Sequence, residues 1–299
     1  MSSGTADAAP ASRTPSRPFG DRLAEAIDAR GRLAVGIDPH AALLAAWGLR
    51  DDVAGLREFA LRSVEALAPH AGVIKPQAAF FERHGSAGLA VLEEVVSAVR
   101  AAGGLSIVDA KRGDIGSTMQ GYADAYLREG SPLAGDAVTL STYLGTSSLA
   151  PAFATAAANG RGVFVLCLTS NPEGAQVQHA READGTSVAA RVARTAAQHN
   201  AAEVAAGAAM GSVGLVVGAT VGGAASELGV DLEAVAGPLL VPGFGAQGGT
   251  AADVRAVVGG AFPFCLPSTS RGVLGAGPDG GALAAAAQRA RREIEEGGS

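Results

Sequence analysis

Residues 105–114 read Leu-Ser-Ile-Val-Asp-Ala-Lys-Arg-Gly-Asp, a short apolar run that leads directly into a cluster of charges. A continuous apolar run, rather than an alternating one, indicates a parallel strand that is buried on both faces. Asp109 and Lys111 are two residues apart, so on a strand their side chains point to the same face. Asp114 lies where we expect the next helix to begin. The stretch therefore predicts a buried strand with charged groups at its C-terminal end.

Similar apolar runs recur along the whole chain. With this one included, they lie at 33–37, 72–74, 105–108, 137–140, 162–168, 213–217, 239–241 and 264–266. Helical patterns separate most of them, with one apolar face at 51–69 and 86–102 and alanine-rich stretches at 186–207 and 281–296. The alternation predicts an α/β fold, a (β/α)8 TIM barrel formed as a single domain by residues 19–299. A doubly wound open sheet is the main alternative, but no Gly-x-Gly-x-x-Gly motif follows the first run.

Composition and charge exclude several classes of protein. The net charge of −6 argues against nonspecific binding of nucleic acid, which requires a basic surface. No stretch approaches the ~18 unbroken apolar residues of a membrane helix. Residues 1–18 are rich in serine, alanine and proline and lack the apolar core of a signal peptide, so they indicate a disordered N-terminal tail. We therefore predict a cytoplasmic protein.

The chain has only two lysines, Lys75 and Lys111, although it is rich in arginine. Arginine cannot give up its proton in a protein, whereas a lysine ammonium can. Both lysines follow predicted strands, and the active site of a barrel forms at the C-terminal ends of its strands. The pattern favours a site that needs a titratable ammonium. Compositional drift is the alternative for Lys75, and a charge at a helix N-terminus is the alternative for Asp114.

The segments that follow the last two predicted strands have residues that could bind an anion. Residues 243–249 are glycine-rich, and Arg271 follows the last strand. In barrels a phosphate group commonly binds at these two positions, because glycine lets backbone N–H groups approach an anion and arginine adds two parallel donors. Gln247 offers a neutral donor in the same segment. Residues 171–185, after the fifth strand, form a longer polar connection that suits either a lid or a plain surface loop.

Two motifs together carry a resemblance to a known family. They are Asp109-x-Lys111-x-x-Asp114 and the segment Pro242-Gly243-x-Gly245-Ala246-Gln247-Gly248-Gly249. With Asp38 and Lys75 after the first two strands, the chain resembles the orotidine 5′-phosphate decarboxylase family, in its longer bacterial branch, from about residue 20 to 290. The resemblance implies cofactor-independent decarboxylation of orotidine 5′-phosphate to UMP and CO2, a step of de novo pyrimidine biosynthesis.

The resemblance also implies a role for each matching residue at the reaction centre. Lys111 would protonate C6 of the pyrimidine, and Asp109 would lie beside the departing carboxylate. Lys75 would bridge this pair and the ribose. Asp114, with Ile115 and Thr118, would reach the site of a neighbouring subunit, which makes the protein a homodimer with shared active sites.

The remaining residues implied by the resemblance bind the substrate away from the reacting bond. Asp38 would hold a ribose hydroxyl, and Ser170 would contact the edge of the pyrimidine. Gln247 and Arg271, with nearby backbone amides, would bind the 5′-phosphate.

Three other interpretations fit parts of the pattern. A metal-dependent decarboxylase or aldolase would need a further carboxylate near Lys75, for which Glu82 is the candidate. A Schiff-base aldolase would use a neutral amine at Lys75 or Lys111. The third interpretation is a non-enzymatic barrel that only binds a nucleotide or a protein, but it does not explain why lysine is present at the two strand ends. The histidines show no spacing typical of a metal site, and we predict no metal and no cofactor.

Overall fold

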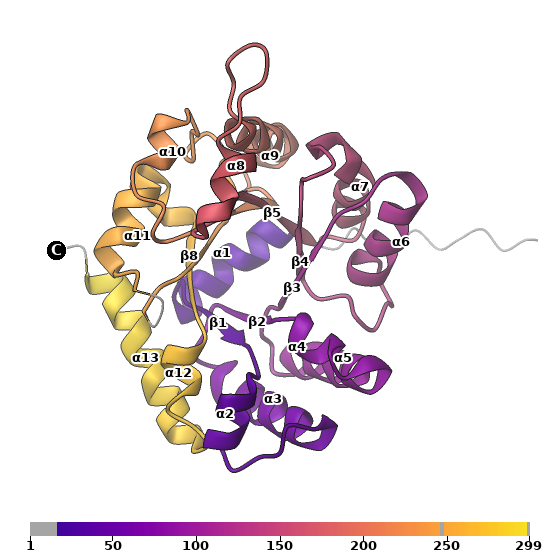
Figure 1. Cartoon of the computed structure of the whole chain (residues 1–299), viewed down its shortest axis with the longest axis vertical. Helices are drawn as coiled ribbons and strands as arrows, with labels where there is room; N and C mark the ends of the chain where they lie inside the picture. The colour runs from indigo at the N-terminus through magenta and orange to yellow at the C-terminus, as the bar shows by residue number, and fades with distance from the viewer. Residues whose placement is uncertain (1–16, 246–247, 298–299) are drawn as a thin grey trace, which may run out of the picture.

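The structure is a computed structural model that describes residues 17–245 and 248–297 (Figure 1). Residues 1–16, which make up most of the predicted tail, lie outside this range. Parallel strands form a sheet in the order β2-β1-β8-β7-β6-β5-β4-β3, and isolated bridges from Ile74 to Ser106 and from Gln77 to Asp109 join its two edges. The strands are β1 (Ala34–Ile37), β2 (Val73–Pro76), β3 (Ile107–Arg112), β4 (Ala137–Leu140), β5 (Gly162–Leu168), β6 (Val213–Val217), β7 (Leu239–Pro242) and β8 (Cys265–Thr269). The predicted TIM barrel is confirmed.

Helices form a ring around the strands (Figure 1). They are α2 (Ala41–Ala46), α3 (Val53–Leu67), α4 (Ala79–Glu82), α5 (Gly85–Ala101), α6 (Gly116–Leu127), α7 (Ala150–Ala158), α8 (Ala175–Gln178), α9 (Val188–Ala205), α10 (Ala224–Glu227), α11 (Ala251–Val258), α12 (Arg271–Leu274) and α13 (Gly280–Glu296). The four predicted helical stretches correspond to α3, α5, α9 and α13. The connection after β6 differs from the expected alternation, because α10 has only four residues.

Several strands extend further toward the mouth of the barrel than their apolar runs indicate. Lys75 lies within β2, where it pairs with Gly36 of β1. Asp109 and Lys111 lie within β3. Apolar composition marks only the part of a strand that is buried on both faces, so it underestimates strands whose ends line a polar cavity.

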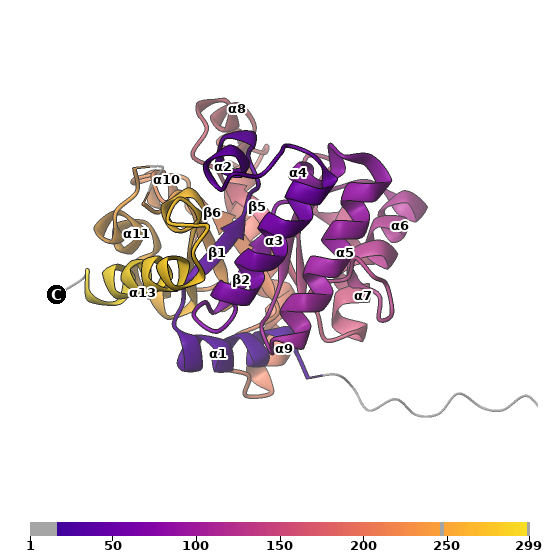
Figure 2. The same cartoon turned by 90° about the horizontal axis from the view of Figure 1, so that it is seen from below.

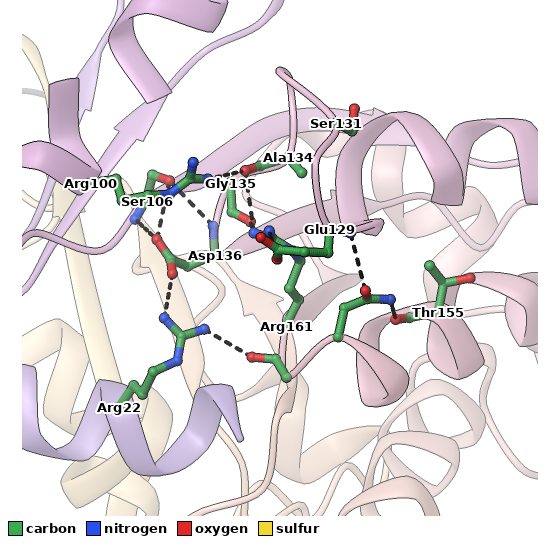
Figure 3. Close-up of polar contacts among 12 residues, drawn as sticks. Arg22, Arg100, Ser106, Glu129, Ser131, Ala134, Gly135, Asp136, Thr155 and Arg161 are labelled. Atoms are coloured by element: carbon green, nitrogen blue, oxygen red, sulfur yellow. Dashed lines mark hydrogen bonds and ion pairs between the residues drawn. The ribbon is translucent and has the colours of Figure 1, made fainter. Parts of the chain in front are cut away.

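Helix α1 (Phe19–Arg30) precedes the first strand and closes the N-terminal end of the barrel (Figure 2). Its Phe19 packs edge-on against Phe164 of β5, with ring centroids 6.0 Å apart, inside the barrel. Arg22 pairs with Asp136 and donates a hydrogen bond to the Gly160 carbonyl (Figure 3). The N-terminal end of the barrel is therefore closed by α1, which leaves the C-terminal end of the strands as the open mouth.

The long connection after β5 has structure of its own. It contains a 3-10 turn (Pro172–Gly174), α8 and an antiparallel bridge from Arg181 to Ser187. None of the helices in the described part of the chain is long and apolar enough to cross a membrane. The cytoplasmic location stays a prediction.

Candidate active site

A cavity of about 340 Å³ opens at the C-terminal ends of the strands. Its walls come from β2, β3, β7 and β8 and from the segments that follow β1, β2, β7 and β8. The lining residues are Asp38, His40, Lys75, Gln77, Asp109, Lys111, Pro242, Gly243, Phe244, Ser268, Thr269, Ser270 and Arg271. The structure thus brings together both lysines, Asp38 and the predicted phosphate-binding residue Arg271.

Asp109 is the centre of a hydrogen-bonded network in this cavity. Its Oδ1 accepts hydrogen bonds from Lys111 Nζ at 2.6 Å and Thr139 Oγ1 at 2.8 Å. Its Oδ2 accepts from Lys75 Nζ at 3.0 Å and Gln77 Nε2 at 2.9 Å. A carboxylate offers about four acceptor positions. All of them are therefore occupied, and the carboxylate has a fixed orientation.

The charges of this network are strongly coupled. Burial alone raises the pKa of Asp109, but the ammonium groups of Lys75 and Lys111 outweigh burial and hold that pKa well below its usual range. Burial likewise lowers the pKa of Lys75, but the carboxylates of Asp109 and Asp38 outweigh it and leave that pKa raised. Asp109 is therefore ionised and Lys75 protonated at neutral pH.

Lys111 has an unusual backbone conformation. Its φ is +48°, in the left-handed region that residues with a side chain rarely adopt. The register of β3 against β4 shifts between Val108 and Arg112, so Lys111 lies in an irregular part of the strand. Its N–H donates to Thr139 Oγ1 at 2.9 Å. The side chain is 45% exposed, in contrast to the buried Lys75, so its ammonium is accessible from the cavity.

Asp38 and Ser270 each hold a buried polar atom that has no partner among the described residues. These atoms are Asp38 Oδ1 and Ser270 Oγ, from residues that line the cavity. An unpaired buried acceptor costs free energy unless a ligand satisfies it. Both atoms suit the hydroxyl groups of a bound sugar.

The predicted anion-binding segments lie at the opposite side of the cavity from β3. Arg271 begins α12, and its guanidinium makes no hydrogen bond or ion pair with the part of the chain that the structure describes. In the loop after β7, Gly243, Gly245 and Gly248 all have positive φ, which allows the chain to turn back so that Gly249 N–H bonds to the Gly243 carbonyl. Gln247 lies outside the described residues.

Four of the predicted residues do not line the cavity of this single chain. Asp114 Oδ1 accepts a hydrogen bond from the N–H of Ile115, and α6 begins only at Gly116, so Asp114 does not cap that helix. Ile115 is 61% exposed, and Thr118 is exposed on the first turn of α6. Ser170 is exposed in the loop after β5.

A family model, that of the orotidine 5′-phosphate decarboxylase / HUMPS family, matches residues 31–286. The chain belongs to this family. The resemblance inferred from the two motifs is confirmed, and with it the prediction of a carboxy-lyase.

Relatives of this family match the chain over nearly its whole length. An orotidine 5′-phosphate decarboxylase of Salinispora arenicola is 59% identical to this chain. The match covers 91% of this chain and 95% of the length of that protein. The orotidine 5′-phosphate decarboxylase of Streptomyces coelicolor is 56% identical, and the match covers 93% of this chain and 97% of the length of that protein. Among solved structures, that of a putative orotidine 5′-phosphate decarboxylase from Streptomyces avermitilis has a TM-score of 0.89 at 55% identity and covers 95% of this chain and 96% of that one.

Sequence reasoning missed some polar residues of the site. Thr139 lies inside an apolar run, where a lone hydroxyl gives no signal. Gln77 lies two residues after Lys75, a spacing that could have identified it as a neighbour on the same face. Glu82, the candidate carboxylate for a metal, instead pairs with Arg112. Within residues 17–245 and 248–297, no group of three or more His, Cys, Asp or Glu side chains could hold a metal ion.

Proposed function

We propose that this protein decarboxylates orotidine 5′-phosphate to UMP and CO2 without a cofactor, as a step of de novo pyrimidine biosynthesis. The observation that carries the proposal is the ionised Asp109 held between the ammonium groups of Lys75 and Lys111 in the cavity. Membership of the orotidine 5′-phosphate decarboxylase / HUMPS family supports the choice of substrate.

Lys111 is the proposed proton donor. When the bond between C6 and the carboxylate breaks, its electron pair stays on C6 as a carbanion with little resonance stabilisation. A nearby ammonium stabilises this charge as it develops and then gives its proton to C6. Lys111 recovers a proton from water after UMP leaves. The accessible Nζ of Lys111 suits this role better than the buried Nζ of Lys75.

Asp109 is proposed to lie beside the substrate carboxylate. The two negative charges repel each other, and the repulsion disappears as CO2 departs. The four hydrogen bonds to Asp109 keep its carboxylate in place and ionised, so that it does not turn away or take up a proton.

The rest of the cavity, together with Lys75, is proposed to bind the ribose and the phosphate. Asp38 and Lys75 hold ribose hydroxyls, for which the unpaired Asp38 Oδ1 is an acceptor. Arg271 and Gln247 bind the 5′-phosphate, and Ser170 contacts the pyrimidine. Binding energy from the phosphate, far from the reacting bond, then helps to lower the barrier at C6.

We also propose that the enzyme is a homodimer in which Asp114, Ile115 and Thr118 complete the partner's site. Ile115 follows β3, and the 78% exposed Tyr143 follows the neighbouring strand β4. A hydrogen bond from Ser141 N–H, 2.7 Å long, joins the loop after β4 to the carbonyl of Arg112 at the end of β3. An exposed apolar rim of this kind is typical of a protein interface.

An absorbance assay with orotidine 5′-phosphate tests the function directly. We expect UMP to form at the same rate in the presence and absence of a metal chelator, and borohydride to leave the rate unchanged. Absence of UMP would contradict the proposal. Loss of activity with chelator would instead favour the metal-dependent alternative, and covalent trapping by borohydride with a carbonyl substrate would favour a Schiff-base aldolase.

A further inference from the structure

The hydroxyl group of Thr139, on β4, is hydrogen-bonded to both Lys111 and Asp109. Its oxygen accepts the Lys111 N–H at 2.9 Å and lies 2.8 Å from Asp109 Oδ1. A backbone N–H can only donate and an ionised carboxylate can only accept, so the one hydroxyl hydrogen must point to Asp109. Residue Thr139 is 1% exposed, so its hydroxyl is shielded from bulk solvent.

The same hydroxyl supports the irregular backbone of β3. This strand pairs regularly with β4 at Val108 and Val138, and pairing resumes only at Arg112 and Leu140. Lys111 lies between these points with its φ of +48°, a strained conformation that persists only where its surroundings enforce it. The Thr139 hydroxyl provides the Lys111 N–H with an acceptor where the register shifts.

We propose that Thr139 is a positioning residue for the decarboxylation. By holding both the Lys111 backbone and the Asp109 carboxylate, it aims the Lys111 ammonium at the reacting carbon. Thr139 does not line the cavity, so it acts through these two residues and does not touch the substrate. This inference rests on the proposed function.

Two substitutions separate the hydroxyl from the rest of the side chain. Thr139→Val keeps the branched shape and removes both hydrogen bonds, whereas Thr139→Ser keeps the hydroxyl and removes a methyl group. We expect Thr139→Val to lower kcat about 10- to 100-fold, because a small misplacement of a reacting group has an effect of this size. Its KM should change less than about threefold, since the phosphate and ribose contacts are untouched, and Thr139→Ser should keep kcat within about threefold.

Two further variants serve as a substitute for Thr139→Val and as a control for the loss of a buried hydroxyl. Thr139→Ala removes the hydroxyl without placing a methyl group against Asp109, so it gives the same comparison with Thr139→Ser if Thr139→Val does not fold. Ser63→Ala removes a buried hydroxyl that bonds to the Phe59 carbonyl within α3, and it should keep the wild-type kcat.

The outcomes distinguish this inference from the proposed function. Turnover of orotidine 5′-phosphate by the wild type together with an unchanged kcat in Thr139→Val and Thr139→Ala would overturn only the role of Thr139. Equal losses in the Ser and Val variants, or an effect confined to KM, would also overturn it. A wild type without turnover would overturn the proposed function and this inference together.

Discussion

Lys111 combines two properties that no arginine of the chain offers, a positive charge and a proton that can be transferred. Its neighbour Arg112 illustrates the difference. The Arg112 guanidinium lies near the rings of Tyr122 and Tyr126 and pairs with Glu82, behind the strand. Consecutive residues of β3 thus have separate tasks: Arg112 anchors the strand end, and Lys111 faces the cavity.

Substitution of Lys111 separates charge from proton transfer. Lys111→Ala should lower kcat at least about a thousandfold, because it removes both the general acid and the charge near C6. Lys111→Arg keeps a charge opposite Asp109 but holds no transferable proton, so its kcat should be nearly as low. Steady-state kinetics with orotidine 5′-phosphate measures both, and circular dichroism checks folding. Activity of Lys111→Arg within tenfold of wild type would contradict proton donation by this residue.

At the level of residues, charged groups were predictable and neutral ones were not. Asp109 and Lys111 directly follow a buried apolar run, and a charge there needs a partner or a function. Thr139 and Gln77 donate to the same carboxylate, but a buried threonine in a strand also satisfies ordinary β propensity. The left-handed backbone of Lys111 gave no signal in the sequence, because it depends on pairing with β4.

At the level of elements, the apolar runs predicted every strand of the barrel but not helix α1. This helix precedes the first strand, so the alternation of strands and helices gave no place for it. Its position depends on contacts distant in sequence: Phe19 enters the barrel, and Gly20 N–H donates to Ser212 Oγ at 3.1 Å. A Cβ at Gly20 would lie against the carbonyl oxygen of Met210 and 2.7 Å from that of Gly211.

Gly20→Ala should therefore destabilise the barrel. The obstructing atoms are backbone oxygens that cannot turn aside, and overpacking of this kind costs about 1–3 kcal/mol. Gly280→Ala is the matched control, because the nearest described atom to a Cβ there is Ala66 Cβ at 3.7 Å, an ordinary contact. Urea unfolding followed by circular dichroism should show a lower free energy of unfolding for Gly20→Ala alone. Equal stability of the two variants would show that α1 does not seal the barrel as tightly as these contacts require.

At the level of the whole molecule, one chain supplies most of the proposed site but not all of it. Lys75, Asp109 and Lys111 meet in one cavity, whereas Asp114 lies outside it and, among the described residues, makes only a local hydrogen bond with the N–H of Ile115. For Asp114 to take part in an active site, as proposed, either its loop must change conformation or a second chain must bring it to a partner's site. The exposed side chain of Ile115, next to Asp114, favours the second chain, because association with a partner would bury it.

A mixture of two inactive variants tests whether subunits share their sites. In a dimer that contains one Lys111→Ala subunit and one Asp114→Asn subunit, one site carries both substitutions and the other carries neither. Random pairing makes half of the dimers hybrids, so the mixture should recover about a quarter of the wild-type activity in a symmetric dimer. Turnover is measured after the subunits have been unfolded and refolded together, with each variant refolded alone as the control. If the mixture is no more active than its components while a tagged subunit captures an untagged one, the dimer forms but Asp114 does not act across its interface.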